Sequence, residues 1–351
     1  MKNKKTTIKD IAQLANVSIG TVDRVLNNRK EVSEKTKKKI LQIVKKSNYS
    51  PNPIASFLSS QKKNIIAVMI PKSKDNSFYW ASPIKGIDIA EAEVKNYGIN
   101  ISKYYFDLWD ESTFKSQSLK ILKQNPDGVI FPPIFSQESL WLTSQLDEKN
   151  IPYLFIDSCL NDTNYLNYVG QDSFQSGYLS ARLISMSVKK SSRLLSLSMI
   201  QNVDNNNNAY QRQLGFMSFF KNSKTKVIQL NLSDNTKNFK SIFIKTLKDK
   251  KIEGIFVSNS MVYKVAAILE ENNIKNIPLI GYDLLDKNVK HLKKENIQFL
   301  IGQRPISQGY KAVKFFYDHF ILKKKFEKNH FIPIDIITKE NVDYFLNDKT
   351  Y

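Results

Sequence analysis

The stretch VSIGTVDRVLNNRKEVSEKT, from Val17 to Thr36, decides the fold of the first part of this 351-residue chain. Val22, Val25 and Leu26 recur at helical spacing, which predicts one buried face of a short helix. The residues between them are polar or charged and belong to the opposite face. Such a helix is either an ordinary amphipathic helix or the element with which a small domain reads DNA.

The flanking segments predict two more short helices beside this one. Each helix begins after a hydroxyl residue that suits an N-cap, and Asp10 completes a capping box with the first of them. The predicted caps are Thr7, Ser18 and Ser33. The residues predicted to face inward are Ile8, Ile11, Ala12, Ala15, Ile40, Leu41 and Val44. Two short helices joined by the turn at 16–18, with a third bracing them, form a helix-turn-helix domain.

The positive charge of the chain is concentrated near its beginning. Residues 1–63 contain 15 Lys and Arg against 4 Asp and Glu, whereas the other 288 residues contain 38 against 29. Because lysine is frequent throughout, the net charge of +20 alone argues for no function. A local basic excess, however, attracts a polyanion such as DNA to that part of the chain.

The segment SPNPIASFLSSQKK, residues 50–63, predicts one further short helix. Asn52 suits its N-cap and Pro53 suits its first turn. A helix of about two turns is marginal alone in water, so this one needs a partner to form.

From Asn64 onward, short apolar runs alternate with helical stretches. Runs without strict alternation are typical of parallel strands that helices cover on both faces. The predicted strands are 65–70, 99–106, 128–133, 152–157, 193–200, 226–232, 254–259, 278–283 and 298–303. The clearest intervening helices are 83–97, 112–124 and 173–187. Because ligands bind at the carboxyl ends of such strands, polar residues just after the runs are candidates for a binding site.

Several classes of protein are disfavoured. The single cysteine, Cys159, forms no intramolecular disulfide, and the basic start lacks the apolar region of a secretory signal, so we expect a cytoplasmic protein. No apolar run is long enough to span a membrane. Phosphate-loop, dinucleotide-binding and nucleophile-elbow motifs are missing, and the three histidines lack metal-ligand spacing. We therefore expect no enzyme, no cofactor and no metal site.

Taken together, these segments resemble bacterial transcription regulators of the lactose-repressor and galactose-repressor type over nearly the whole chain. The segments TIKDIAQLANVSIGTVDRVLN, VSEKTKKKI and NYSPNPIASFL stand in order at the spacing of that family. The rest resembles ribose-type periplasmic sugar-binding proteins. The resemblance implies an all-α helix-turn-helix domain with a hinge helix, followed by an α/β sensor whose two lobes contain parallel sheets.

The resemblance also implies the domain limits. The DNA-binding headpiece would occupy 1–50, the hinge 51–62, and the sensor and dimerisation domain 63–351. Within the sensor, lobe 1 would comprise about 64–171 and 304–332, and lobe 2 about 172–303 and 333–345, with three crossovers around a ligand cleft.

For DNA, the resemblance places Ile19, Gly20 and Arg24 at base-reading positions in the major groove. Arg24 can donate two hydrogen bonds to guanine. Leu58 would wedge between base steps in the minor groove, where the hinge helices of two subunits pair. Hydroxyl and amide residues suited to phosphate contacts are Thr7, Ser18, Thr21, Asn27, Ser33 and Thr36. Gly20 and Asp23 depart from the family pattern, so the operator of a relative cannot be assumed.

For the ligand, the resemblance assigns eight cleft residues: Asn76, Phe78, Tyr79, Asp157, Arg212, Asn259, Asp283 and Gln303. Aromatic rings stack on the apolar faces of sugars, while amides and carboxylates pair with hydroxyls. Ser158, Ser260 and Pro132 depart from residues that sugar binders carry. The effector therefore stays open among a sugar, a sugar phosphate, another polyol and a nucleoside.

The sequence thus predicts a dimeric, allosteric transcription regulator, most simply a repressor, that binds a double-stranded DNA operator under control of a small polar ligand. One alternative is the solute-binding protein of a transporter, which would need export and no DNA-binding domain. The other is an architectural DNA-binding protein without ligand control, against which the large sensor argues.

Overall fold

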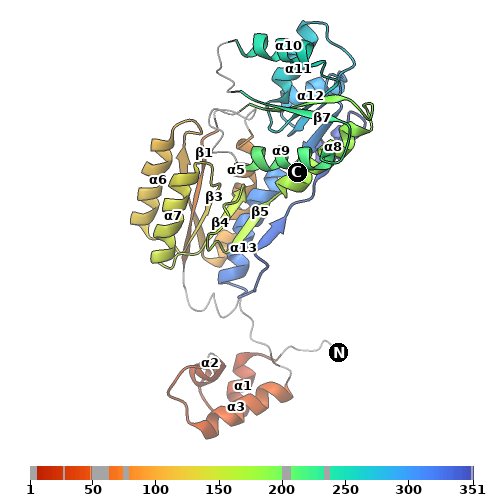
Figure 1. Cartoon of the computed structure of the whole chain (residues 1–351). Helices are drawn as coiled ribbons and strands as arrows, with labels where there is room; N and C mark the ends of the chain where they lie inside the picture. The colour runs from red at the N-terminus through yellow and green to blue at the C-terminus, as the bar shows by residue number, and fades with distance from the viewer. Residues whose placement is uncertain are drawn as a thin grey trace. The chain divides into compact units, whose positions relative to one another are not determined.

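The computed structural model describes residues 6–26, 28–47, 49, 63–73, 79–199, 207–232, 238–348 and 351 (Figure 1). The chain divides into two compact units. The first comprises Met1–Lys62 with Ile321–Lys323, and the second comprises Lys63–Phe320 with Lys324–Tyr351. The predicted hinge at 51–62 lies outside the described residues.

The described residues of the first unit form three helices, α1 (Ile8–Ala15), α2 (Ile19–Leu26) and α3 (Glu34–Lys46). The predicted capping box is confirmed, because the backbone N–H of Thr7 donates to Asp10 Oδ2 at 2.7 Å and that of Asp10 donates to Thr7 Oγ1 at 3.3 Å. The hydroxyls of Ser18 and Ser33 likewise accept backbone N–H groups at the starts of α2 and α3. These caps satisfy donors that each helix start would otherwise leave unpaired.

The core of this helix-turn-helix unit is small and apolar. Its buried residues are Ile11, Ala12, Ala15, Val22, Val25 and Ile40. The prediction that Leu41 faces inward is wrong, since 44% of its surface is exposed. Ile40, Ile43 and Val44 fill the inner face of α3 at helical spacing, so Leu41 is turned about 100° away from it.

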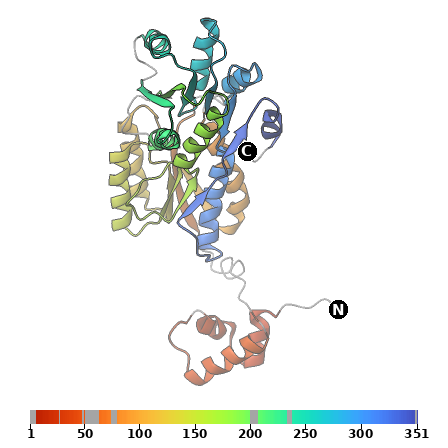
Figure 2. The ribbon, with the colours of Figure 1, turned by 45° about the vertical axis from the view of Figure 1, so that its right-hand side comes forward.

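The second unit contains two six-stranded sheets, each flanked by helices (Figures 1 and 2). The first sheet has the order β11-β5-β4-β3-β1-β2 with all neighbours parallel. Its strands are β1 (Asn64–Pro71), β2 (Ile99–Phe106), β3 (Gly128–Phe131), β4 (Tyr153–Asp157), β5 (Asn167–Gly170) and β11 (Asn329–Phe331). The helices packed with it are α5 (Ala81–Val94), α6 (Glu111–Gln124), α7 (Ser136–Glu148) and α13 (Pro305–Phe320), and the short 3-10 helix η1 (Lys95–Tyr97) follows α5. We call this assembly the first lobe.

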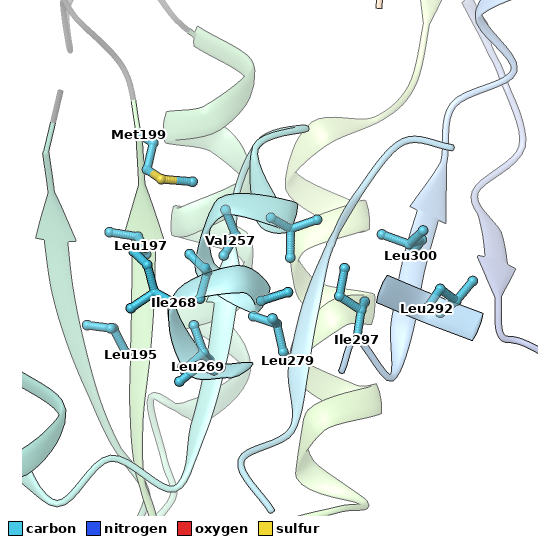
Figure 3. Close-up of a cluster of buried hydrophobic side chains, with 14 of the residues drawn as sticks. Leu195, Leu197, Met199, Val257, Ile268, Leu269, Leu279, Leu292, Ile297 and Leu300 are labelled. Carbon is cyan, nitrogen blue, oxygen red and sulfur yellow. The ribbon is translucent and has the colours of Figure 1, made fainter. Parts of the chain in front are cut away.

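The second sheet has the order β12-β10-β9-β8-β6-β7, in which only β12 is antiparallel to its neighbour. Its strands are β6 (Arg193–Ser198), β7 (Lys226–Asn231), β8 (Gly254–Val257), β9 (Leu279–Tyr282), β10 (Phe299–Gly302) and β12 (Asp335–Ile337). Its helices are α8 (Ser173–Ser185), α9 (Asn207–Phe220), α10 (Phe239–Lys250), α11 (Val262–Glu271), α12 (Asp286–Lys293) and α14 (Val342–Asn347). This assembly is the second lobe. Figure 3 shows its apolar cluster, in which Leu195 and Leu197 of β6 lie with Ile268 and Leu269 of α11.

The chain passes between the two sheets three times. The crossings join β5 to α8, β10 to α13, and β11 to β12. All nine predicted strands coincide with observed strands, whereas β5, β11 and β12 had no counterpart in the prediction. Strands β11 and β12 are only three residues long, and the four residues of β5, Asn-Tyr-Val-Gly, form no continuous apolar run that could be recognised.

The two lobes share one device for packing helices closely. In the first lobe α5 meets α13 through Gly86 and Gly309, and in the second α9 meets α8 through Gly215 and Gly177. A Cβ added at any of these glycines would stand 1.9–2.1 Å from a carbonyl oxygen of the partner helix. In each case that carbonyl belongs to the residue three positions before the partner glycine. The lobes are therefore built on the same plan, which makes their other residues comparable position by position.

Candidate functional site

The outer face of α2 presents the residues predicted to read bases. Ile19 is 44% exposed, and the Arg24 side chain is 49% exposed. Around Gly20 the nearest atom to an added Cβ is Ser18 Oγ at 3.7 Å, so the backbone there is open to a close approach. Arg24 Nε lies 4.0 Å from a carboxylate oxygen of Glu31. An exposed ion pair at that distance contributes little, so the guanidinium is available to a base.

The predicted phosphate-contacting hydroxyls lie at helix starts. Ser18 Oγ stands 2.9 Å from Thr21 Oγ1, and Ser33 Oγ stands 2.9 Å from Thr36 Oγ1. Together with Thr7, they surround three helix N-termini, where backbone dipoles favour an anion. The hydroxyls are engaged as caps, and their contact with phosphate stays a prediction. Asn27 and Leu58 lie outside the described residues.

In the second unit, Asp157 ends β4 and is held by side chains from both lobes. Tyr79 donates its hydroxyl hydrogen to Asp157 Oδ1 at 2.7 Å. From α9 of the second lobe, Asn208 Nδ2 lies 3.2 Å from Asp157 Oδ2 and 2.9 Å from its carbonyl oxygen. Asn76 and Phe78, which were predicted to lie beside Tyr79, lie outside the described residues.

Asp283, directly after β9, belongs to a second group of contacts. Gln303 Nε2 donates to Asp283 Oδ1 at 2.8 Å, and Gln303 Oε1 accepts from Arg212 Nη2 at 2.5 Å. Arg212 also donates to the carbonyl oxygen of Ser258 at 3.1 Å and lies over the Tyr282 ring at 3.9 Å. The structure therefore brings Arg212, Asp283 and Gln303 together at the carboxyl ends of the strands of the second lobe.

Asp157 and Asp283 occupy equivalent places in the two lobes. Asp157 ends β4 and Asp283 follows β9, and each of these strands is third in the spatial order of its sheet given above. Both residues have a positive φ, 65° for Asp157 and 70° for Asp283. A non-glycine residue in that conformation carries strain of the kind that clusters at ligand-binding sites. The contacts of both carboxylates offset that cost and aim them at the same region.

The site is rich in buried charge. Burial raises the pKa of Asp283 to about 7, against the opposing effects of the Arg212 charge and the Gln303 hydrogen bond. Burial also raises the pKa of Asp157, although Tyr79 and Arg212 oppose it. Among the described residues, Arg212 Nε and Ser258 Oγ are buried with no hydrogen-bond partner. Buried polar atoms of this kind are costly unless a bound molecule satisfies them.

Asn259 makes different contacts from the other predicted cleft residues. Its Nδ2 donates to the carbonyl oxygen of Met199 at 2.8 Å, and its Oδ1 accepts the backbone N–H of Met261 at 3.2 Å. Both ends of the amide therefore hold the loops after β6 and β8. Its predicted role in ligand binding stays untested.

Comparison with known proteins matches both parts of the chain. Residues 7–52 match the model for bacterial regulatory proteins of the lacI family, and residues 66–325 match a periplasmic binding protein domain. A crystal structure from Bacteroides fragilis, assigned to the LacI transcriptional regulators, superposes with a TM-score of 0.75 and 30% identity. The superposition covers 81% of this chain and 99% of that one. This chain belongs to the lacI family.

Curated relatives extend the comparison. The probable HTH-type transcriptional repressor ExuR of Bacillus subtilis is 34% identical over 171 residues, which are 47% of this chain and 47% of ExuR. The chain thus spans about half the length of that relative. NtdR of Bacillus subtilis, named as the regulator of the NTD biosynthesis operon, is 28% identical over 286 residues, 79% of this chain and 82% of NtdR.

Against this family background, the sequence prediction missed two residues that connect the site. Asn208 lies four residues before Arg212 on one face of α9, a spacing that would have marked it. Gln308, on α13, contacts Asp157 and Gln303 through their backbones, and no sequence signal points to such contacts.

No helix of the described chain is long and apolar enough to cross a membrane. Among the described residues, no group of three or more His, Cys, Asp or Glu is arranged to hold a metal ion.

Proposed function

We propose that this lacI-family protein is a sequence-specific DNA-binding transcriptional repressor whose operator affinity depends on a small polar ligand, most simply a sugar or sugar derivative. The observation that carries the proposal is the buried group of Arg212, Asp283 and Gln303, with the half-buried Asp157 near it, in the same chain as an exposed reading helix. The names of its relatives as transcriptional repressors and regulators support it. Catalysis forms no part of the proposal, and the cytoplasm is its natural compartment.

The chemistry of the cleft supports a ligand rich in hydroxyl groups. Two carboxylates supply acceptors, while the guanidinium and amide of Arg212 and Gln303 supply donors. Sugars present both kinds of partner on one small ring, and Tyr79 offers an aromatic face beside Asp157.

We propose that two copies act together on DNA. A single helix-turn-helix unit per chain, with a predicted hinge helix too short to form alone, suits a homodimer on a pseudo-palindromic operator. The predicted limits of headpiece, hinge and lobes remain the proposed domain boundaries. Footprinting should show protection with two-fold symmetry, and full affinity of one copy for one half-site would contradict the dimer.

The ligand is tested by a thermal-shift panel on the full chain. D-galactose, D-arabinose, D-allose and D-tagatose are suitable probes, because proteins that share this fold are named for or bound to them. Nucleosides and sugar phosphates complete the panel. A sugar that raises the melting temperature and changes affinity for DNA selected from a random pool supports a ligand-controlled regulator. DNA binding that no probe alters favours the architectural alternative, and sugar binding without DNA binding favours a solute-binding protein.

Arg24→Ala should weaken binding to the selected operator by about 1–3 kcal/mol and relax base preference at one position in each half-site. The reason is that a bidentate arginine contact distinguishes guanine from other bases. The measurement is fluorescence anisotropy on the operator and on single-base variants. Arg193→Ala, which removes an exposed arginine of the second unit, is the control. Equal losses on the operator and on random DNA would show that Arg24 contacts only the backbone.

A further inference from the structure

Gln308 lies on α13 with only 1% of its surface exposed. Its Oε1 accepts the backbone N–H of Asp157 at 3.0 Å, and its Nε2 donates to the carbonyl oxygen of Gln303 at 2.8 Å. One amide therefore bonds at both ends to the backbones of two cleft residues. Because the amide is planar and buried, its two bonds fix the separation of those backbones.

The side chains of neighbouring residues complete a closed ring of contacts. Gln303 accepts a hydrogen bond from Arg212, and Asn208, one turn before Arg212 on α9, donates to Asp157. The path from Asp157 through Gln308, Gln303 and α9 thus returns to Asp157. A shift at one side of the ring must be taken up by the others, and Gln308 is its link through backbone atoms.

Comparison of the two lobes shows that the packing of α13 does not itself require a glutamine. The equivalent residue on α8 is Ser176, which directly precedes the helix-pairing Gly177 as Gln308 precedes Gly309. The Ser176 hydroxyl lies 2.9 Å from that of Tyr282, while the backbone N–H of Asp283 donates to a strand carbonyl instead. The second lobe therefore uses the same helix pairing, but the side chain at the equivalent position of α8 bonds to Tyr282 and not to Asp283.

A second buried glutamine limits movement where the chain crosses between lobes. Gln171, in the first crossing, donates from Nε2 to the carbonyl oxygens of Gly302 at 3.0 Å and Pro333 at 3.1 Å. These carbonyls border the second and third crossings. One side chain of the first crossing therefore bonds to backbone carbonyls at the second and the third. Gln303, which follows Gly302, is linked to all three crossings in this way, and Gln308 links Gln303 to Asp157.

We propose that Gln308 is a positioning residue for ligand binding, which holds Asp157 of the first lobe in register with Gln303 at the second crossing. The inference rests on the proposed function, since it takes Asp157 and Gln303 to bind the ligand. Gln308 itself acts only through the two backbones that it joins.

The test uses two variants of the full chain, Gln308→Met, which keeps the volume, and Gln308→Ser, which copies the residue of the second lobe. Asn167→Ser is the matched control. Asn167 is also 1% exposed and donates to a carbonyl, that of Glu327 at 2.7 Å, but it begins β5, at the end of the strand opposite the cleft. Isothermal titration calorimetry measures Kd for whichever of D-galactose, D-arabinose, D-allose or D-tagatose stabilises the unmodified chain most. Hydrogen exchange reports on the end of β4.

Both Gln308 variants should raise Kd about tenfold or more, the size expected for losing one or two buried hydrogen bonds, and should speed exchange at the Asp157 amide. Asn167→Ser should lower the melting temperature while leaving Kd and that amide unchanged. Unchanged Kd in a folded Gln308 variant would overturn the inference, as would equal Kd changes in the control. If no probe binds the unmodified chain, the proposed sugar ligand fails instead.

Discussion

Replacing Arg212 with methionine should abolish the thermal shift by sugar and lower the free energy of unfolding at pH 8 by about 3–5 kcal/mol. Arg212 is 4% exposed and supplies the positive charge beside the Asp157 and Asp283 carboxylates. Methionine fills part of the space but leaves the buried Asp283 and the half-buried Asp157 without the positive charge of Arg212. It also removes the donor to Gln303, so the ring of contacts opens.

Urea unfolding and the thermal-shift panel measure the two effects separately. Arg182→Met serves as the control, because Arg182 is exposed on α8 and lies over the Phe219 ring. The loss of stability should shrink below pH 6, where protonation removes the buried negative charge of Asp283. An Arg212→Met protein with unchanged stability and an unchanged sugar response would show that the cleft lies elsewhere.

Asp283→Asn should make the unliganded protein more stable at pH 8, by up to about 4 kcal/mol, while weakening sugar binding. Asp283 is 6% exposed, and burial raises its pKa from 3.8 to about 7. The folded protein therefore binds a proton between those pH values that the unfolded chain does not. It follows that the contribution of Asp283 to stability rises as pH falls from 8 through 7 and levels off near 4.

Asparagine keeps an acceptor for Gln303 and cannot ionise, so it should flatten this part of the pH dependence. Urea unfolding at pH 8, 7, 6 and 5 provides the measurement, with Asp249→Asn on the exposed end of α10 as control. The raised pKa of Asp157 makes a contribution of the same sign, which stays in every variant. A variant that is less stable than the parent at pH 8 would contradict the argument. A stabilised but weakly binding variant is the usual trade between stability and function.

The sequence predicted those parts of the fold that local pattern and turn chemistry determine. The capping box at Thr7 and the strand at 99–106 need only neighbouring residues to be recognised. Strand β11 could not be found in that way, because its three residues are exposed and pair with β5 from a distant part of the chain. Leu41 was misplaced because it stands three residues before Val44, a spacing that also fits one helical face, whereas the inner face is centred on Ile40, Ile43 and Val44.

The candidate site was predicted through resemblance, residue by residue, and the structure shows why that route has limits. Asp157, Arg212, Asp283 and Gln303 come together, and their ligand-binding role remains a prediction. Gln308 escaped notice because it makes its contacts with backbone atoms, which any residue supplies. A side chain that bonds to backbone atoms can have almost any residue type as its partner, so the sequence contains no pair of side chains that marks the contact.

The glycines of the paired helices and the residues at the strand ends differ in how freely they can change during evolution. A side chain at Gly86 or Gly215 would collide with backbone, so those positions tolerate almost no mutation. Asp157 ends β4 and Asp283 directly follows β9, away from the helix pair, so a substitution there can alter recognition without disturbing that pair. A lineage that comes to bind a different ligand could therefore change these two strand-end residues while it keeps the helix pairing unchanged.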